Sequence, residues 1–323
     1  MAKFRVVITE TDFELPPTIE ESQLTPIDAE VIVAQCKTED DLIEACADAD
    51  GLIFQYASLT ARVLDTLKNC RVIARYGTGM DTIDIPAAVA RGIVCCNVPG
   101  FCLSEVADHT MALLLACGRG IVRLNDSVRD GVWDAVGVSK TTERLTGQTI
   151  GFIGLGAIAG AVATRARAFD LQPIAFSPRA PDSAFESSGI RRVELDELFE
   201  TSDFVSVHTP LRPETHHLIN ARALDLMKPT AYLINTARGG LVDNQALLSA
   251  LESGSIAGAA LDVMDPEPMP ADSPLHQAPN LIITPHAGFF SLTAMEILRR
   301  ETAAEVARVL SGQEPRSSVT TQR

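Results

Sequence analysis

The sequence predicts an α/β fold made of two units, each with a parallel sheet. Short runs rich in β-branched residues alternate with segments of helical periodicity, a pattern typical of parallel strands joined by crossover helices. This series runs through the first third of the chain and starts again near residue 149. A length of 323 residues also exceeds what a single hydrophobic core usually organises, so two domains of ordinary size are expected.

The first series contains five predicted strands. Each is a short apolar run, and they cover residues 4–9, 31–34, 51–54, 72–75 and 93–96. Helices are predicted between them at 39–47 and 85–91. A long connecting helix then follows from Ser104, a suitable N-cap, to about residue 129. The weakly patterned segment 124–143 carries the only tryptophan, Trp133.

The second series contains six predicted strands and ends in a long helix. The strands cover residues 150–153, 173–176, 204–207, 231–235, 258–263 and 281–284. Helices are predicted at 160–170 and 243–253, where Asp243 is a suitable N-cap and Gly254 a suitable stop. A final helix at 292–311 leads into a polar tail, residues 313–323, which we expect to be mobile.

Composition excludes several classes of protein. The chain is 46% hydrophobic and 21% charged, which is ordinary for a globular protein and excludes a disordered, collagen-like or coiled-coil one. Its net charge of −15 repels nucleic acid and anionic lipid, so neither is an expected partner. No apolar run approaches the roughly 20 residues that cross a bilayer, and no signal peptide precedes the first strand. These features favour a cytoplasmic protein without a membrane partner.

The cysteines indicate a reducing environment and no metal centre. All seven lie within the first 117 residues, and their spacing matches no metal site. We therefore expect reduced thiols that serve as small apolar core residues.

A glycine-rich turn follows the first strand of the second series and precedes a helix. Gly154 and Gly156 permit a tight turn and the close approach of a pyrophosphate. The amides of Ala157 and Ile158, at the helix N-terminus, would meet its charge, and Ala159 occupies the third position of the motif. This context favours a dinucleotide cofactor. The alternative is a turn that only packs the helix on the strand.

The next strand ends without the acidic residue that usually binds the adenine ribose of NAD. Ser177 lies there, 23 residues after Gly154, and Arg179 follows it. A small hydroxyl leaves room for a 2′-phosphate and an arginine pairs with one, so we predict that NADP(H) is accepted or preferred. The alternative is that Arg179 is an ordinary surface charge and NAD(H) binds without its usual anchor.

One cation, one carboxylate and one imidazole occur just beyond three successive strands. These are Arg238, Glu267 and His286, and open α/β sheets place their ligands at such strand ends. Each residue alone has an ordinary explanation: a helix cap, a solvated charge or a buried histidine. Their joint occurrence at consecutive strand ends favours a catalytic site.

The motifs together resemble the D-isomer-specific 2-hydroxyacid dehydrogenases, nearest the branch that contains the C-terminal-binding proteins. The resemblance spans about residues 50 to 310 in unbroken order. It is carried by the run from Arg75 to Asp81, the Gly154 loop, His208-Thr209-Pro210-Leu211, Thr236-Ala237-Arg238-Gly239-Gly240, Glu267-Pro268 and Pro285-His286.

The resemblance implies two Rossmann-like domains with parallel sheets. Both chain ends, residues 1–100 and 290–323, would form a flavodoxin-like substrate domain. The NAD(P)-binding domain, residues 101–289, would be inserted between them.

The resemblance also implies hydride transfer between NAD(P)H and a 2-oxo acid, giving an (R)-2-hydroxy acid. His286 would give the proton to the substrate oxygen and, in the reverse direction, act as the base. Glu267 would orient the imidazole and favour its charged form. Arg238 would bind the substrate carboxylate and polarise the carbonyl.

Further contacts are implied by the same matching. Backbone donors of the turn of Gly77, Thr78 and Gly79 would bind the substrate carboxylate, and Arg75 would be a substrate-side arginine. Asp262 would hold the nicotinamide carboxamide. The implied cofactor contacts are Thr78, Gly154, Gly156, Ala157, Ile158, Ser177, Arg179, Thr209, Pro210, Thr215, Thr236, Ala237, Arg238, Asp262, His286 and Gly288. Threonines and prolines after strands are also common turn formers. Four histidines match no catalytic motif and are expected on surfaces or in packing positions: His109, His216, His217 and His276.

Aromatic residues near the motifs bear on the substrate. If Tyr56, Phe289 and Phe290 face the pocket, they favour an apolar or aromatic substrate side group. The alternative is aromatic packing at the hinge. A phosphorylated substrate would need a basic cluster, and the motifs place only Arg75 there, so phosphoglycerate is less favoured.

Two other functions stay open at this point. One is a nucleotide-sensing dimeric interaction protein on the same fold, with little turnover. The other is a β-hydroxyacid or imine reductase, although such enzymes normally carry the glycine-rich turn at the N-terminus. Homodimerisation is implied by the resemblance, through the helix near 107–119 and the segment of Trp133.

Overall fold

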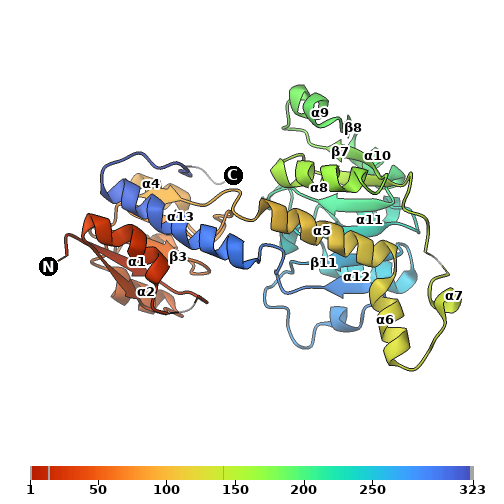
Figure 1. Ribbon diagram of the computed structural model, residues 1–323, viewed down its shortest axis with the longest axis horizontal. Coiled ribbons are helices and arrows are strands. Elements are labelled where there is room, and N and C mark those ends of the chain that lie inside the picture. The colour runs from red at the N-terminus through yellow and green to blue at the C-terminus, as the bar shows by residue number, and fades with distance from the viewer. Residues whose placement is uncertain (1, 14, 141, 321–323) are drawn as a thin grey trace. The chain divides into compact units, whose positions relative to one another are not determined.

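The computed structural model describes residues 2–13, 15–140 and 142–320. The chain divides into two compact units (Figure 1). The first unit contains the residues up to Phe101 and those from Ser291 onward, and the second runs from Cys102 to Phe290. Each unit holds one parallel sheet, as the sequence predicts.

The first unit has a five-stranded sheet in the order β2-β1-β3-β4-β5. Its strands are β1 (Phe4–Ile8), β2 (Ala29–Val33), β3 (Gly51–Phe54), β4 (Val72–Arg75) and β5 (Val94–Cys96). One face is covered by α2 (Glu39–Cys46), α3 (Ala61–Leu64) and α4 (Ile85–Ala90). The other packs against α1 (Thr18–Leu24) and α13 (Leu292–Leu310), with the short helix η1 (Thr25–Ile27) after α1 (Figure 1). Such two-sided cover explains why the strands are continuous apolar runs.

A buried ion pair joins α1 to α13 and also contacts Tyr76, the residue that follows β4. Arg299 donates from Nε and Nη2 to the two carboxylate oxygens of Glu20 at 2.7 and 2.8 Å. The hydroxyl of Tyr76 donates to the same carboxylate at 2.7 Å. Burial raises the pKa of Glu20, but these hydrogen bonds and the charge of Arg299 lower it overall. The network therefore anchors the start of the turn that follows Arg75.

The C-terminal segment is ordered against the first unit, so the expectation of a mobile tail is wrong for residues 313–320. The amide of Val319 donates to the carbonyl of Cys95 at 2.8 Å, and the Val319 side chain is buried. Glu305 accepts hydrogen bonds from the amides of Arg316 and Ser317. One apolar residue among polar ones thus attaches the segment to the sheet edge. Residues 321–323 lie outside the described part of the chain.

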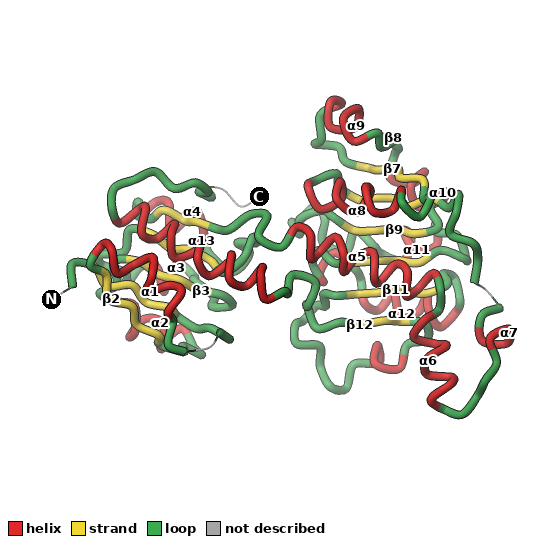
Figure 2. The backbone as a smooth tube through the Cα atoms, in the orientation of Figure 1, coloured by secondary structure: helices red, strands yellow, loops and turns green. Residues whose placement is uncertain are grey.

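The second unit has a seven-stranded sheet in the order β12-β11-β10-β9-β6-β7-β8 (Figure 2). The strands are β6 (Thr149–Ile153), β7 (Gln172–Phe176), β8 (Arg191–Arg192), β9 (Phe204–Val207), β10 (Tyr232–Asn235), β11 (Gly258–Leu261) and β12 (Leu281–Ile283). The chain runs from β6 outward to β8 and then crosses back to β9 on the other side of β6. This reversal is the switch point at which doubly wound sheets bind ligands.

Helices cover both faces of this sheet. One core lies under α5 (Leu103–Gly118) and α8 (Ala157–Arg167). The opposite core lies under α10 (Leu195–Thr201), α11 (Ala221–Leu226) and α12 (Asn244–Ser253). The remaining short elements are α6 (Ile121–Arg129), α7 (Ala135–Val138), α9 (Asp182–Ser188), η2 (Gly239–Leu241) and η3 (Pro274–Gln277). Among the described residues no helix has the length and apolar character to span a membrane.

The long helix predicted from Ser104 to about residue 129 is wrong, because the structure has two helices there. Gly120 adopts a left-handed φ of 62° between α5 and α6, which ends the first helix. Cys102, not Ser104, occupies the N-cap position of α5. The predicted ends of α12 are confirmed: Asp243 accepts two amide hydrogen bonds at its N-terminus, and Gly254 adopts φ 71° after it. All seven cysteines are free thiols.

Candidate active site

Three loops that leave adjacent strands carry the residues predicted to act in catalysis. The register pairs Asn235 on β10 with Leu261 on β11, and Leu261 with Ile283 on β12. Because the strands are parallel, the loops that follow them begin side by side at one edge of the sheet. The alignment brings the three predicted catalytic residues to that edge from separate parts of the sequence.

Arg238 lies in a turn whose shape is held by Asn235. The side-chain oxygen of Asn235 accepts a hydrogen bond from the amide of Ala237 at 3.0 Å, and its side-chain nitrogen donates to the carbonyl of Arg238 at 2.8 Å. Arg238 donates from Nη1 to the carbonyl of Ala237 at 2.8 Å. Asn235 is fully buried, so its bonds within the turn satisfy groups that have no access to water. Sequence reasoning missed this residue, because an asparagine at a strand end carries no motif of its own.

Gly239 brings the Arg238 turn against the loop that carries Glu267. A Cβ atom at this position would collide with the backbone carbonyl of Met264, so the close approach requires glycine. The positive charge of Arg238 is near enough to contribute to the lowered pKa of Glu267. The cation and the carboxylate therefore belong to one cluster.

Glu267 holds the imidazole of His286. Its Oε2 lies 2.8 Å from His286 Nδ1, and its Oε1 accepts a hydrogen bond from the amide of Met264 at 2.9 Å. Burial raises the pKa of Glu267, but the hydrogen bonds from His286 and Met264 and the nearby positive charges lower it overall. A carboxylate on Nδ1 fixes the ring and directs Nε2 to act on a ligand. The ring is 44% exposed on its side chain, so a ligand can reach it.

Asp262 fixes the backbone on both sides of His286. Its Oδ1 accepts hydrogen bonds from Thr284 Oγ1 at 2.5 Å and from the amide of Ala287 at 2.8 Å. Its Oδ2 accepts from the amide of Gly288 at 2.9 Å. Burial raises the pKa of Asp262, but these donors and His109 lower it overall, to about 2. The carboxylate thus stays ionised and holds the His286 loop.

Helix α5 supplies two polar residues to the strand ends. His109 Nε2 lies 3.0 Å from Thr284 Oγ1 and 3.2 Å from Asp262 Oδ1. Thr110 Oγ1 shares a hydrogen bond of 2.9 Å with Thr236 Oγ1. Sequence reasoning missed both contacts, and His109 has a polar role rather than only a surface or packing one. The other histidines that match no motif lie elsewhere: His216 stacks on His217, and His276 bonds to the carbonyl of Pro270.

The glycine-rich turn lies at the same edge, in the middle of the sheet. Gly154 adopts φ 102°, and a Cβ atom there would come within 2.5 Å of the carbonyl of His208, which explains both its backbone and its contact. Gly156 is the N-cap of α8 and has no side-chain cap bond, and the space that its Cβ would occupy is open. The amides of Ala157 and Ile158 therefore start a helix with room for an anion, which fits a dinucleotide pyrophosphate.

The predicted cofactor residues on either side of this turn lie in ordered loops. Arg179, after β7, donates from Nη2 to Oε1 of Glu214 at 2.9 Å, and Ser177 precedes it by two residues. The loop after β9 contains Thr209 and Pro210. Thr215 closes that loop, because its hydroxyl donates to the carbonyl of Pro210 at 2.8 Å.

The predicted substrate residues of the first unit lie at the ends of β3 and β4, which pair Phe54 with Arg75. Arg75 donates to the carbonyls of Gln55 and Gly79, and so closes the turn that contains Gly77 and Thr78. Thr78 Oγ1 donates to the carbonyl of Val98 at 3.2 Å. The register therefore brings these residues together at one edge of their own sheet.

Glu10 organises the neighbouring loop and was missed by sequence reasoning. Its Oε1 accepts hydrogen bonds from the amides of Gln55, Tyr56 and Ala57 at 2.9, 2.5 and 2.7 Å. The Tyr56 hydroxyl donates to Asp12 at 2.9 Å, and the residue is 58% exposed. The sequence did hold one signal for Glu10, because it is an acidic residue directly after the first strand.

In the second unit, the ring of Phe289 packs edge-on against His286 with centroids 5.9 Å apart.

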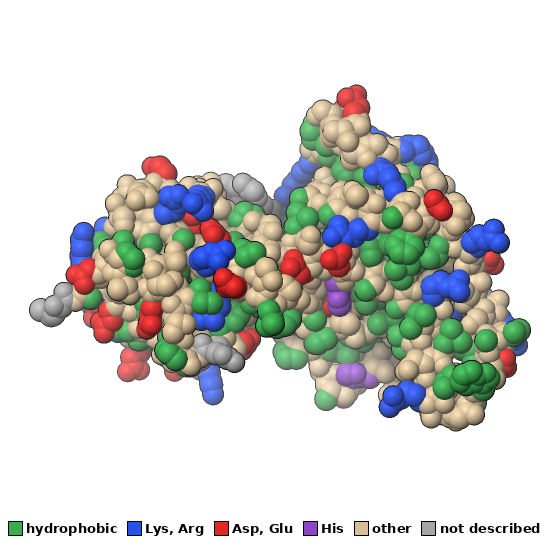
Figure 3. Space-filling view, viewed as in Figure 1, with side chains coloured by type: hydrophobic (Ala, Val, Ile, Leu, Met, Phe, Trp, Pro, Cys, Tyr) green, Lys and Arg blue, Asp and Glu red, His purple; other side chains and the backbone are tan. Residues whose placement is uncertain are grey.

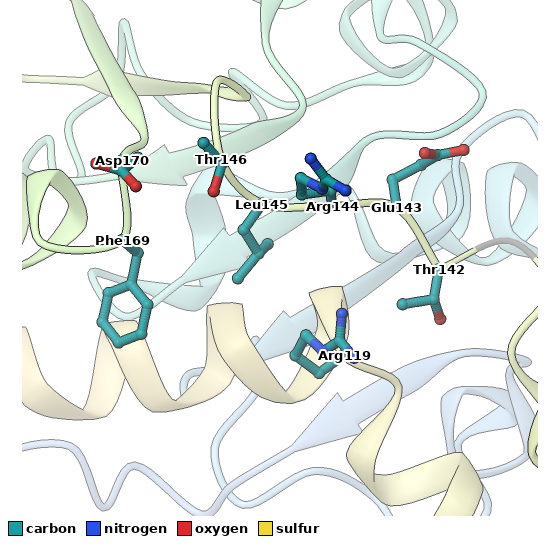
Figure 4. Close-up of a pocket in the computed structure, with 8 residues that line it drawn as sticks. All are labelled: Arg119, Thr142, Glu143, Arg144, Leu145, Thr146, Phe169 and Asp170. Atoms are coloured by element: carbon teal, nitrogen blue, oxygen red, sulfur yellow. The ribbon is translucent and has the colours of Figure 1, made fainter.

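A hollow of about 500 Å³ lies at the other end of the seven-stranded sheet (Figure 4). It is lined by Arg119 at the end of α5, by residues 142–146 before β6 and by Phe169 and Asp170 before β7. These positions precede the strands, whereas the predicted site follows them. The hollow is therefore separate from the candidate active site.

Comparisons with known proteins identify the family of this chain. Residues 111–288 match the family profile described as D-isomer specific 2-hydroxyacid dehydrogenase, NAD binding domain. The chain is 39% identical over 294 residues to a glyoxylate reductase of Thermofilum pendens, covering 88% of this chain and 87% of that protein. It is also 39% identical over 286 residues to a D-3-phosphoglycerate dehydrogenase of Methanocaldococcus jannaschii, covering 88% of this chain and 54% of that longer protein.

A solved structure extends the comparison to a bound cofactor. The structure of an acyclic imino acid reductase in complex with NADPH and D-Arg matches 98% of this chain and 99% of its own, with a TM-score of 0.87 and 28% identity. The fold, the strand-end residues and the sequence matches lead to the same assignment. The chain belongs to the D-isomer specific 2-hydroxyacid dehydrogenase family, and its second unit carries the nicotinamide cofactor-binding domain of that family.

Proposed function

We propose that this enzyme reduces 2-oxo acids to (R)-2-hydroxy acids with a reduced nicotinamide cofactor, and catalyses the reverse reaction with the same residues. The observation that carries the proposal is the Glu267–His286 pair at 2.8 Å, on the strand ends beside Arg238. An imidazole fixed at Nδ1 and a guanidinium are the groups that carbonyl reduction of an acid requires. The relatives named for glyoxylate and phosphoglycerate chemistry support the reaction class.

His286 and Arg238 divide the work on the substrate. His286 gives a proton from Nε2 to the substrate oxygen as the carbonyl is reduced, and takes it back in the reverse direction. Glu267 stabilises the charged imidazole until the proton leaves. Arg238 binds the carboxylate and stabilises charge on the carbonyl oxygen. The nicotinamide, when bound, supplies or accepts the hydride.

The proposed cofactor contacts lie in the second unit, apart from Thr78 in the first. The Gly154–Gly156 turn and the amides of Ala157 and Ile158 would hold the pyrophosphate. The remaining contacts would be Thr78, Ser177, Arg179, Thr209, Pro210, Thr215, Thr236, Ala237, Arg238, Asp262, His286 and Gly288. Ser177 and Arg179 favour acceptance or preference of NADP(H), and the NADPH-bound relative supports this. Residues 101–289 would form this NAD(P)-binding domain, with 1–100 and 290–323 as the substrate domain.

The substrate contacts proposed for the first unit are Tyr56, Arg75, Gly77 and Thr78, with Phe289 from the second. Tyr56 is half-exposed and Phe289 lies against His286, which favours an apolar or aromatic side group on the substrate. A second candidate reaction has one specific observation in its favour. The acyclic imino acid reductase shares this fold, so reduction of a C=N bond by the same hydride and proton transfer is the alternative.

A homodimer is also proposed. The segment around α6 and α7 exposes Trp133 at 89% and Val136 at 81% of their surface, and Figure 3 shows hydrophobic side chains gathered there. Exposed apolar patches of this kind are typical of interaction sites, and we assign this one to a second copy of the chain. With α5, this segment is the proposed contact with a second copy.

Removal of either catalytic side chain should abolish most activity. We expect His286→Ala and Arg238→Ala each to lower kcat/KM for a 2-oxo acid by about 10²–10⁴-fold, because proton transfer or carboxylate binding is lost. His276→Ala and Arg222→Ala are matched controls, since His276 bonds to the carbonyl of Pro270 and Arg222 to the carboxylate of Asp196, and none of these is a proposed site residue. Near-normal kcat/KM in a site variant would remove that residue from the mechanism.

Asp262 should make stability depend on pH. Its folded pKa of about 2 lies below the ordinary 3.8, so its stabilisation is present above about pH 4 and is lost as the pH falls through 2. We expect Asp262→Asn to remove about 2 kcal/mol at neutral pH and to flatten the dependence between pH 4 and 2. Denaturant unfolding at a series of pH values measures this, with the exposed Asp272→Asn as control. Equal slopes in wild type and Asp262→Asn would contradict the assignment.

Substrate preference is measured with a panel of 2-oxo acids and both reduced cofactors, followed at 340 nm by nicotinamide absorbance. We expect turnover of phenylpyruvate or 2-oxobutyrate to exceed that of 3-phosphohydroxypyruvate, because the proposed pocket is aromatic. Parallel assays with an added amine test C=N reduction. Cofactor binding without turnover of any substrate would instead favour a nucleotide-sensing interaction protein.

The proposed dimer predicts a mass of about twice 34.6 kDa in sedimentation equilibrium. Trp133→Glu places a charge in the proposed interface and should shift the protein to the monomer. Val89→Glu, at an exposed apolar position of the first unit, is the matched control. A monomeric wild type, or a Trp133→Glu variant that stays dimeric, would be evidence against this interface.

A further inference from the structure

An ion pair joins the loops that leave the two strands on either side of β6. The register pairs Ile153 of β6 with Phe176 of β7 and with Val207 of β9. The loops after all three strands therefore start at one level, with the glycine-rich turn in the middle. Arg179, from the β7 side, meets Glu214, from the β9 side, at 2.9 Å. The pair thus connects the two loops that flank the proposed cofactor turn.

Each loop is also held by its own hydrogen bonds, independently of this pair. Arg192 on β8 donates to the carbonyl of Ala180 at 2.6 Å and so anchors the loop of Arg179. In the other loop, Thr215 Oγ1 accepts from the amide of Arg212 at 2.8 Å and donates to the carbonyl of Pro210. A change at Glu214 is therefore expected to leave both loops folded.

We propose that Glu214 is a coenzyme-specificity residue that lowers affinity for the 2′-phosphate of NADP(H) by neutralising Arg179. The inference rests on the proposed binding of that phosphate beside Ser177 and Arg179. Glu214 acts in two ways. It occupies the guanidinium that would bind the phosphate, and its own negative charge repels the phosphate.

The exposure of the two side chains decides whether a ligand can displace Glu214 from Arg179. The side chains of Arg179 and Glu214 are 66% and 57% exposed. An exposed ion pair contributes little, because water screens it and two long side chains must be ordered, so a doubly charged phosphate can replace the carboxylate. Arg212 Nη1 lies 3.8 Å from Glu214 Oε1. It is a second cation with which the carboxylate can pair when the phosphate binds Arg179.

NAD(H) is not affected by this competition. Its ribose carries a neutral 2′-hydroxyl, which neither needs the charge of Arg179 nor is repelled by Glu214. The ion pair can stay closed when NAD(H) binds and must open when NADP(H) binds. Glu214 would therefore shift the preference toward NAD(H) at a site whose other residues favour the 2′-phosphate.

The test is Glu214→Gln, with binding measured by calorimetric titration of NADPH, NADH and 2′,5′-ADP. The last ligand carries the 2′-phosphate without the nicotinamide, so it reports on this contact without any turnover. We expect Kd for NADPH and 2′,5′-ADP to fall by about two- to fivefold, the upper part of the range that an exposed ion pair provides, and Kd for NADH to stay unchanged. Glu197→Gln, which breaks the exposed 2.7 Å pair with Arg191, is the matched control and should change none of them.

Two outcomes would overturn the proposal: unchanged Kd values for all three ligands, or equal weakening of NADPH and NADH, which would assign Glu214 a structural role. The baseline tests the proposed coenzyme separately. If wild type binds no NADPH and Glu214→Gln gains it, the acceptance of NADP(H) fails but the role of Glu214 is supported. If wild type binds NADPH and Arg179→Ala weakens it while Glu214→Gln has no effect, the coenzyme proposal stands and this inference fails.

Discussion

The level alignment of strand ends is the constraint on which the rest of the second unit depends. Parallel hydrogen bonding fixes Asn235, Leu261 and Ile283 in one row, so each following loop needs only a few residues to bring its functional side chain to the common edge. The same register places the turn of Gly154 between the loops of Ser177 and His208. One geometric rule thus explains both the candidate catalytic cluster and the proposed cofactor turn. A slip of one residue in any of these strands would reverse every side chain along it.

At this edge of the sheet, Asp262 determines the backbone conformation of the loop that carries His286. A histidine at φ 51° lies in a backbone region that costs a non-glycine residue about 1–2 kcal/mol. The carboxylate offsets this by accepting bonds from the two amides that follow His286 and from Thr284. A buried carboxylate is stable only with such donors, and His109 supplies a further contact from α5. The strained conformation is therefore over-determined by its surroundings, as is typical of functional loops.

The strands and the motif residues could be predicted from the sequence, because both depend on local signals. Continuous apolar runs identify buried parallel strands, and polar residues directly after them identify the ligand edge. The residues that support the site depend on contacts between distant parts of the chain. His109 and Thr284 are 175 positions apart, and Thr110 and Thr236 are 126 apart, so no spacing links them.

Errors in the predicted elements have similar causes. The single helix predicted through residue 120 was inferred from an apolar periodicity, but Gly120 ends the first of two helices there. The docked C-terminal segment was missed because one buried valine among polar residues carries too little signal. Short elements such as α1, α3, α9, α10, α11 and β8 have too few residues for a periodic pattern.

Three pairs of a carboxylate with a basic side chain differ mainly in how deeply they are buried. Glu20 and Arg299 are 1% and 12% exposed, so removal of one partner would leave a charge without solvent, and the pair is a permanent part of the scaffold. Glu267 and His286 are 38% and 44% exposed. That is enough burial to fix the ring through Nδ1 and enough access for a ligand to reach the imidazole. Arg179 and Glu214 are mostly exposed, so their attraction is weak enough to exchange for an incoming anion. The degree of burial, rather than the residue types, separates a fixed support from the proposed acid and the proposed exchangeable contact.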